Sequence, residues 1–444
     1  MAAAGVSGID AATRRRLLRY QIGTVILLFA GYAAYYFCRS DLSVATPLII
    51  DDLRRQGIDS SSATIQIGRI ASFGVLAYAI GKLTLASVAD FVGGRRNFIG
   101  GLAGAAFFSI LFLFGGSIPV FTFAWIGNRY AQSGGWAGLV KIAGGWFSYS
   151  SYGTAMALLS ISYLVGDAAA RQAMGAMIHL GFGWRSLFLF AAAVAFALLL
   201  VNAVFLKGSR RDAGLPEPEV NPLNLFRQSG GAEKPARIRS LLGTLLGSPV
   251  FLLVCLLSLG CTLVRETFNT WTPTYFHQFL GFAADRAASA SALFPLIGAV
   301  SVLLAGWGSD RLGAGGRAVI SFFGLLLSVL ALLLLSTLPH AGLNALHVGL
   351  VGAVAFGLLG PYSYLAGAMA MDFGGRQGSA ASSGLIDGIG YIGGILAGDS
   401  MARISVSFGW QGAFLVLGAV CFLSALAAAG LFFSQTRRAP GKPA

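Results

Sequence analysis

Long apolar segments recur along the whole chain, and they restrict it to a fold that lies in a membrane. Of its 444 residues, 56% are hydrophobic and only 11% are charged. We count about twelve segments that reach the roughly 20 residues a helix needs to cross a bilayer. We therefore predict an all-α integral membrane protein. The predicted spans cover residues 20–50, 63–89, 98–116, 120–146, 152–180, 185–206, 249–276, 287–308, 318–338, 343–371, 380–406 and 411–434.

The charged residues gather at the ends of these segments. The net charge of +14 would suit a nucleic-acid partner, but pairs such as Arg95-Arg96 and Arg437-Arg438 follow the positive-inside pattern of membrane proteins. We therefore exclude nucleic acid and predict an even number of spans with both termini in the cytoplasm. No signal-type segment precedes the first span, so we expect that span to be retained in the plasma membrane, which in bacteria is the inner membrane.

The sequence carries no recognisable motif for catalysis or metal binding. Its four cysteines all lie in apolar segments, and none has the Cys-x-x-Cys spacing of a metal site. Gly-x-Ser-x-Gly, His-Glu-x-x-His and a Gly-Lys-Ser/Thr phosphate loop are absent from the sequence. We therefore predict buried thiols at Cys38, Cys255, Cys261 and Cys421, with no metal, no cofactor and no enzymatic activity.

Arg39 lies deep inside the first predicted span. An arginine in hydrocarbon is costly, so its side chain should face the protein interior or a water-filled cavity. Tyr32, Tyr35 and Tyr36 precede it by seven, four and three residues, and Ser43 follows by four. Helical spacing places these side chains on one face. That face suits an anion, although an arginine that only bonds backbone carbonyls or a buried carboxylate fits the same pattern.

The two halves of the chain look like a repeat. Phe182-Gly183-Trp184 recurs at Phe408-Gly409-Trp410, and Arg39 recurs at Arg265, both 226 residues later. The acidic turns at Asp90 and Asp310 are separated by 220 residues. We predict two six-helix halves, residues 1–206 and 248–444, joined by a cytoplasmic linker at 207–247 that is rich in Pro, Gly and charge.

The paired arginines predict a site for a dianion. In transporters built from parallel repeats, substrates bind near the bilayer midplane between the halves. Arg39 and Arg265 would then face one cavity from opposite sides. A guanidinium group donates two parallel hydrogen bonds, which match the oxygens of a phosphoryl group. The repeat therefore favours the ligand interpretation of Arg39 over the structural one.

Several further stretches carry a family resemblance. They are Gly31–Arg39 with Pro47, Lys82 before Ala86–Asp90, Asn128 and Gln132–Trp136 with Lys141, Arg210–Pro216, Arg265 with Trp271–Tyr275, Gly360-Pro361, and Gly390–Gly394. The chain resembles the major facilitator superfamily and, within it, the organophosphate:phosphate antiporters. The resemblance implies exchange of inorganic phosphate for a phosphorylated metabolite by rocking of the two halves. It also implies that Arg39 and Arg265 hold the phosphoryl group, with Lys82 nearby.

The chain departs from the family pattern near the predicted site. Ser40, followed by Asp41, stands where the family usually has lysine, and Tyr163 stands where the bacterial glycerol-phosphate type has histidine. Our substrate-binding candidates are Arg39, Arg265, Lys82, Tyr32, Tyr35, Tyr36, Gln132, Tyr163 and Asn269. Our coupling or gating candidates are the acids Asp387, Glu266, Asp167, Asp90 and Asp310. For Asp387, an ion pair that stabilises one conformation competes with a proton-carrying role.

Three functions remain in competition. The first is exchange of a sugar phosphate or glycerol phosphate for inorganic phosphate. The second is proton-coupled symport of an organic anion such as a carboxylate, which the acids at membrane depth favour. The third is a sensor that binds a sugar phosphate without transporting it. Besides the anionic substrate, phosphate and membrane lipid, we expect no nucleic-acid partner, and we expect a monomer.

Overall fold

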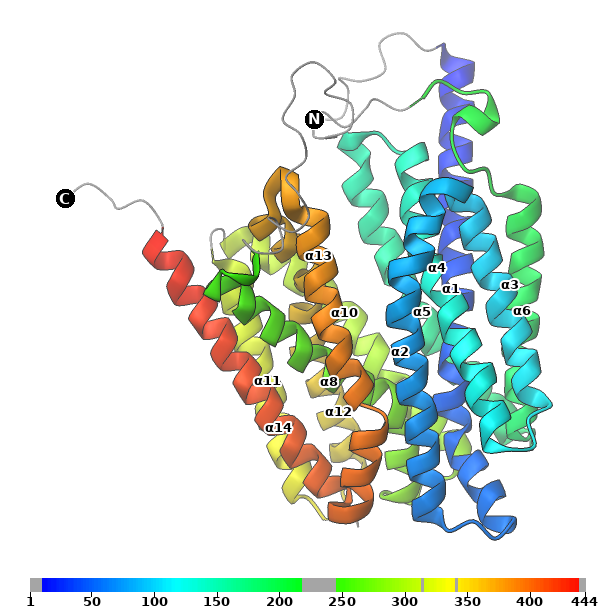
Figure 1. The fold of residues 1–444 in the computed structure, drawn as a ribbon, viewed down its shortest axis with the longest axis vertical. Helices are drawn as coiled ribbons and strands as arrows, with labels where there is room; N and C mark the ends of the chain where they lie inside the picture. The colour runs from blue at the N-terminus through cyan, green and yellow to red at the C-terminus, as the bar shows by residue number, and fades with distance from the viewer. Residues whose placement is uncertain (1–9, 218–244, 313–314, 340–341, 439–444) are drawn as a thin grey trace. The chain divides into compact units, whose positions relative to one another are not determined.

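The computed structural model describes residues 10–217, 245–312, 315–339 and 342–438, and all regular structure among them is helical. This agrees with the predicted all-α fold (Figure 1). The first half contains α1 (Ala11–Arg55), α2 (Ser60–Val92), α3 (Gly94–Leu113), α4 (Ile118–Trp146), α5 (Tyr149–His179) and α6 (Trp184–Phe205). A short 3₁₀ helix, η1 (Arg211–Ala213), follows.

The second half contains more helices than predicted spans. They are α8 (Pro249–Gln278), α9 (Ala284–Ser291), α10 (Leu293–Leu312), α11 (Gly316–Thr337), α12 (Asn344–Tyr364), the π-helix η2 (Leu365–Met369), α13 (Ala370–Leu396) and α14 (Asp399–Arg438). The predicted span at 287–308 is divided into α9 and α10. The predicted span at 380–406 is interrupted between α13 and α14. Gly409 has a φ of 70°, which breaks α14, because glycine adopts positive φ without a Cβ clash.

The helices account for the predicted membrane spans. Within the described residues, nine ranges are long and apolar enough to cross a membrane. One of them, Ser382–Ser434, contains the predicted span at 411–434 and most of the predicted span at 380–406. The remaining predicted spans are α4 and α5, which carry more polar residues. The helices therefore agree with a twelve-span chain.

Backbone contacts divide the chain into two compact units. Unit 1 comprises residues 1–41, 76–170 and 185–224, and unit 2 comprises residues 42–75, 171–184 and 225–444. The helices α1, α2 and α5 therefore each contribute to both units. The predicted division into residues 1–206 and 248–444 follows the sequence repeat and stays a prediction.

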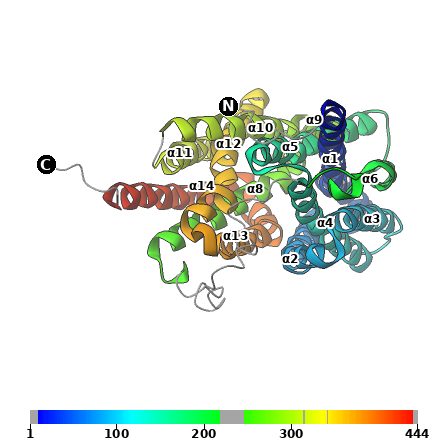
Figure 2. The same cartoon turned by 90° about the horizontal axis from the view of Figure 1, so that it is seen from above.

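Small residues allow helices to pack closely within each unit. In unit 1, α3 and α4 lie side by side (Figures 1 and 2), and a Cβ at Gly138 would meet the Gly94 carbonyl oxygen at 2.8 Å. In unit 2, α8 packs against α13, where Gly390 lies against Ser258. Such small-residue contacts are common between membrane helices. They bring the polar side chains of neighbouring helices within bonding distance.

The start of the predicted linker is held against unit 1. The indole Nε1 of Trp146 donates to the Lys207 carbonyl oxygen over 2.9 Å. The Nε of Arg210 donates to the Trp146 carbonyl oxygen over 2.8 Å. Residues 218–244, most of the predicted linker, lie outside the described residues.

Candidate functional site

Three positively charged side chains converge on one tyrosine ring in unit 1. The ring centroid of Tyr78 lies 4.9 Å from Cζ of Arg39 and 4.9 Å from Cζ of Arg129. The Nζ of Lys82 lies 5.6 Å from the same centroid. Each distance is within the roughly 6 Å range of cation–π contacts. We call Arg39, Tyr78, Lys82 and Arg129 the cationic cluster.

Three helices supply this cluster. Arg39 comes from α1 and Arg129 from α4, while Tyr78 and Lys82 lie one turn apart on α2. Tyr78 is 4% exposed and Arg129 is 3% exposed, and Arg39 and Lys82 are half-buried. The electron-rich ring face offsets part of the repulsion among the cations. An anion among these groups would be attracted by all three positive charges, more strongly than in bulk water.

Aromatic side chains lie next to the cluster. Cζ of Arg39 is 5.2 Å from the Tyr36 ring centroid, and the Tyr36 and Tyr163 centroids are 5.5 Å apart. Tyr32 packs against Tyr36 at 5.9 Å and against Trp136 at 5.3 Å. The structure therefore brings Tyr36 and Tyr163 together beside Arg39, and Tyr32 contacts Tyr36.

Two other candidate ligands use polar groups to join helices. The Tyr35 hydroxyl donates to the Phe98 carbonyl oxygen over 2.5 Å, and Tyr35 is only 1% exposed. The Nε2 of Gln132 donates to the Cys38 carbonyl oxygen over 2.7 Å and also to the side-chain oxygen of Asn128. We infer that Tyr35 and Gln132 position α1 against α3 and α4.

Two buried carboxylates of unit 1 accept hydrogen bonds from serines. The Ser40 hydroxyl donates to Oδ1 of Asp167 over 2.5 Å. The Ser109 hydroxyl donates to Oδ2 of Asp41 over 3.3 Å. Asp41 is 0% exposed and Asp167 is 5% exposed. Position 40, where the resemblance leads us to expect lysine, therefore joins α1 to α5 through a hydroxyl group.

Arg265 forms a buried ion pair in unit 2. Its guanidinium donates to the Glu266 carboxylate, and its Cζ lies 4.2 Å from the Tyr362 ring centroid. Arg265 is 7% exposed and Glu266 is 3% exposed. Helical spacing alone directs these neighbours about 100° apart. The side chains bend toward each other because a buried charge is costly without a partner.

Asn269 contributes its backbone to a second contact network in unit 2. Its carbonyl oxygen accepts from the Ser43 hydroxyl over 2.7 Å and from Nη2 of Arg171 over 2.8 Å. Nη1 of Arg171 donates to the Ser291 hydroxyl over 3.0 Å. Arg171 is 2% exposed. These bonds tie the ends of α1 and α5 to α8 and α9.

The remaining acidic candidates lie on different helices. Asp387 is half-buried on α13. Asp90 and Asp310 belong to α2 and α10, but their side chains lie outside the described part of the chain. Their predicted roles in coupling or gating stay predictions.

Metal binding has no structural support in the described ranges. Among those residues, no group of three or more His, Cys, Asp or Glu side chains could hold a metal ion. The four cysteines are buried free thiols, as their apolar segments predicted.

Sequence comparison places this arrangement in a known family. A sequence model described as the Major Facilitator Superfamily matches residues 28–398. The chain belongs to the Major Facilitator Superfamily. This match covers most of α1 through α13 and includes both Arg39 and Arg265. It also supports the expectation that this superfamily member is not an enzyme.

Several relatives align with this chain over most of their length. The "Membrane sensor protein UhpC" of Escherichia coli is 29% identical over 93% of this chain and 92% of its own. The "Glycerol-3-phosphate transporter" of Bacillus subtilis is 27% identical over 94% and 93%. The "Probable hexose phosphate transport protein" of Chlamydia trachomatis is 26% identical over 90% and 88%. These similarities confirm the resemblance to organophosphate transporters drawn from the motifs.

Solved structures share the fold. A bacterial homologue of the human lysosomal transporter Spinster, in an inward-facing and unoccupied conformation, has a TM-score of 0.70. It is 16% identical and matches 96% of this chain and 99% of its own. The similarity confirms the superfamily fold predicted from the sequence.

Two functional candidates emerge only from the structure. Arg129 and Arg171 each lie within a predicted span. A charged side chain is costly in hydrocarbon, and this cost could have marked both arginines as candidates from the sequence. Arg129 follows Asn128 in α4, and Arg171 follows Asp167 by one turn in α5. Neither was among the predicted site residues, and neither has an arginine 226 residues later in the sequence, as Arg39 does.

Proposed function

We propose that this chain is a secondary active transporter that exchanges a phosphorylated metabolite for inorganic phosphate. The cationic cluster supports this proposal most directly. It presents two guanidinium groups and one ammonium group around a buried ring, which suits a phosphoryl dianion better than a monovalent anion.

Arg39 and Arg265 are the proposed phosphoryl ligands. Arg39 belongs to the cationic cluster, and Tyr36 and Tyr163 beside it provide hydroxyl groups for a polar substrate. Arg265 occupies the corresponding position of the repeat. Its guanidinium would leave Glu266 for the substrate, so that the buried positive charge of Arg265 has a partner both with and without substrate. Lys82 and Arg129 add positive charge next to Arg39.

The relatives favour a sugar phosphate or glycerol phosphate as the organic substrate. The names of the B. subtilis and C. trachomatis proteins specify glycerol 3-phosphate and hexose phosphate. We also propose alternating access of the two halves, a monomer, and an inner-membrane location with both termini in the cytoplasm. The basic segment ends support that orientation.

Proton-coupled symport of an organic anion is the second candidate. The buried carboxylates favour it, because a buried acid can hold a proton during a transport cycle. Asp167, Glu266 and Asp387 are its candidate proton carriers. A sensor is a third candidate, and the similarity to UhpC supports it.

Phosphate exchange in proteoliposomes tests the proposal. Vesicles preloaded with phosphate take up labelled phosphate through the wild type, Arg39→Ala, Arg265→Ala and the control Arg96→Ala. Arg96 is exposed at the start of α3. We expect each site variant to lower exchange about tenfold to a hundredfold, since a hydrogen bond to a charged group contributes about 1.5–3 kcal/mol. The control should match the wild type.

The alternatives give different results in the same vesicles. Uptake that needs a pH gradient and stops with an uncoupler would establish symport. Specific binding of a sugar phosphate without flux would establish a sensor. Folded wild type with neither exchange nor phosphate binding would refute the antiport proposal.

A further inference from the structure

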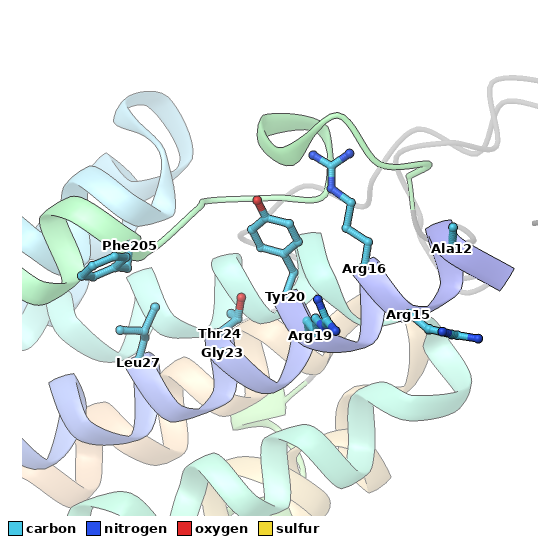
Figure 3. A pocket seen from close by; sticks show the side chains of 9 residues that line it. All are labelled: Ala12, Arg15, Arg16, Arg19, Tyr20, Gly23, Thr24, Leu27 and Phe205. Atoms are coloured by element: carbon cyan, nitrogen blue, oxygen red, sulfur yellow. The ribbon is translucent and has the colours of Figure 1, made fainter. Parts of the chain in front are cut away.

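We propose that a pocket beside the first turns of α1 binds the head group of an anionic phospholipid. This α1 pocket has a volume of about 680 Å³ and belongs entirely to unit 1. The residues that line it include Arg15, Arg16, Arg19, Tyr20, Leu27 and Phe205 (Figure 3).

One half of the α1 pocket is strongly basic. Arg15 and Arg19 are exposed and lie one turn apart on α1. No hydrogen bond or ion pair joins either side chain to another described residue, and no acidic residue is among the described residues that line the pocket. Three arginines within five positions attract a phosphate ester, for which guanidinium is a suitable donor.

Arg16 and Tyr20 give this half a fixed wall. Nη2 of Arg16 donates to the Ala213 carbonyl oxygen over 3.0 Å, and its Cζ lies 5.8 Å from the Tyr20 ring centroid. Tyr20 stacks on Trp146 with 5.6 Å between ring centroids. The wall is therefore formed before any ligand arrives, which lowers the entropy cost of binding.

The other half of the α1 pocket is apolar. Figure 3 shows Leu27 and Phe205 at the end away from Arg15. Phe205 is 65% exposed, and the neighbouring Ile26 and Val204 are 60% and 65% exposed. Exposed apolar side chains on a membrane helix form its lipid-facing surface. The pocket therefore opens onto the surface that acyl chains cover.

The spacing of the two halves matches a phospholipid. Arg19 and Leu27 are eight residues apart on α1, about 12 Å along the helix axis. Tyr20 lies between the basic and apolar halves, as aromatic residues do at the membrane interface. A free phosphate ion would use only the arginines, whereas a phospholipid would also fill the apolar half. Basic pockets between membrane helices bind anionic head groups in this way.

Lipid retention by the purified protein tests this inference. The full-length wild type and the variant R15Q/R19Q are reconstituted in nanodiscs with equal amounts of phosphatidylglycerol and phosphatidylcholine. After extraction with mild detergent, native mass spectrometry counts each lipid that remains bound. R14Q/R96Q is the matched control, because it removes two exposed arginines of unit 1 that do not line the pocket.

We expect the wild type to retain phosphatidylglycerol preferentially and R14Q/R96Q to match it. In R15Q/R19Q this preference should be about 25-fold lower, because each arginine near a head group contributes roughly fivefold. Equal retention of the two lipids by the wild type would by itself overturn the inference. An unchanged preference for phosphatidylglycerol in R15Q/R19Q would also overturn it.

A competition arm separates the lipid from a soluble anion. Millimolar inorganic phosphate is added to the wild type before extraction. Retained phosphatidylglycerol supports a lipid site. Its displacement by phosphate would show that the arginines bind a soluble anion and would overturn the lipid assignment. All these outcomes are independent of the proposed transport function, because the α1 pocket shares no residue with the cationic cluster.

Discussion

The guanidinium carbon of Arg129 lies 4.9 Å from the ring centroid of Tyr78, at the same distance as that of Arg39. Two arginines from different helices therefore use one aromatic ring. This arrangement makes Arg129 part of the surroundings of the proposed phosphoryl ligand, although no arginine stands 226 residues after it, as Arg265 does after Arg39.

Replacing Arg129 by glutamine should weaken substrate binding more than it affects folding. Because one positive charge near the phosphoryl dianion is lost, we expect KM for phosphate exchange to rise about tenfold. This rise corresponds to a loss of roughly 1.5 kcal/mol of binding free energy. Proteoliposome kinetics measure this change. Arg96→Gln, an exposed replacement of the same type, should leave KM unchanged. An unaltered KM in Arg129→Gln would remove this residue from the site.

Replacing Glu266 by glutamine tests whether the buried pair with Arg265 carries a proton. Under the antiport proposal, Glu266 only neutralises Arg265 between substrates. Glu266→Gln should then retain phosphate exchange without a pH gradient, and its KM should stay the same or fall because one competitor for Arg265 is gone. Exchange is measured with and without an uncoupler. If wild-type uptake needs the gradient and the variant loses that dependence, Glu266 carries the coupling proton.

Removing the Ser40 hydroxyl should destabilise unit 1. Ser40→Ala deletes the donor that lies 2.5 Å from Oδ1 of Asp167. The loss of a buried hydrogen bond to a charged acceptor predicts a decrease in stability of about 1–3 kcal/mol. Thermal unfolding of the detergent-purified protein should show a lower apparent Tm. Ser160→Ala is the control, since the Ser160 hydroxyl bonds, among the described residues, only the Met156 carbonyl within its own helix. Equal Tm values for the two variants would contradict the prediction.

Arg171 should be more important for stability than its neighbour on α5. Arg171→Met removes hydrogen bonds to Ser291 and Asn269, and we expect a loss of about 1–3 kcal/mol. Gln172→Met removes one bond from an exposed side chain to the Ser289 carbonyl and should change stability by no more than about 0.5 kcal/mol. The apparent Tm distinguishes them. A smaller effect for Arg171→Met than for Gln172→Met would show that the Arg171 network contributes little.

Individual spans illustrate which helices could be predicted from the sequence alone. The apolar run at 318–338 is α11 almost to the residue, because about 20 apolar residues in lipid have few options besides a helix. The run at 380–406 is divided between α13 and α14 at Ala397 and Gly398, a break that hydropathy does not indicate. The helical face of Arg39 was likewise predictable, because Tyr36 lies three residues away on the same helix and helical spacing is local.

Pairings between helices were not predictable in the same way. The sequence by itself determined the membrane fold, the superfamily motifs and the face on which Arg39 lies, since each depends on spacing within one segment. Only the tertiary structure decided that Tyr35 and Gln132 are used in packing and that Ser40 bonds Asp167. It also decided that Arg129 shares the Tyr78 ring. Each of these contacts joins residues from different helices, and their distance depends on how the helices pack rather than on the local order of residues.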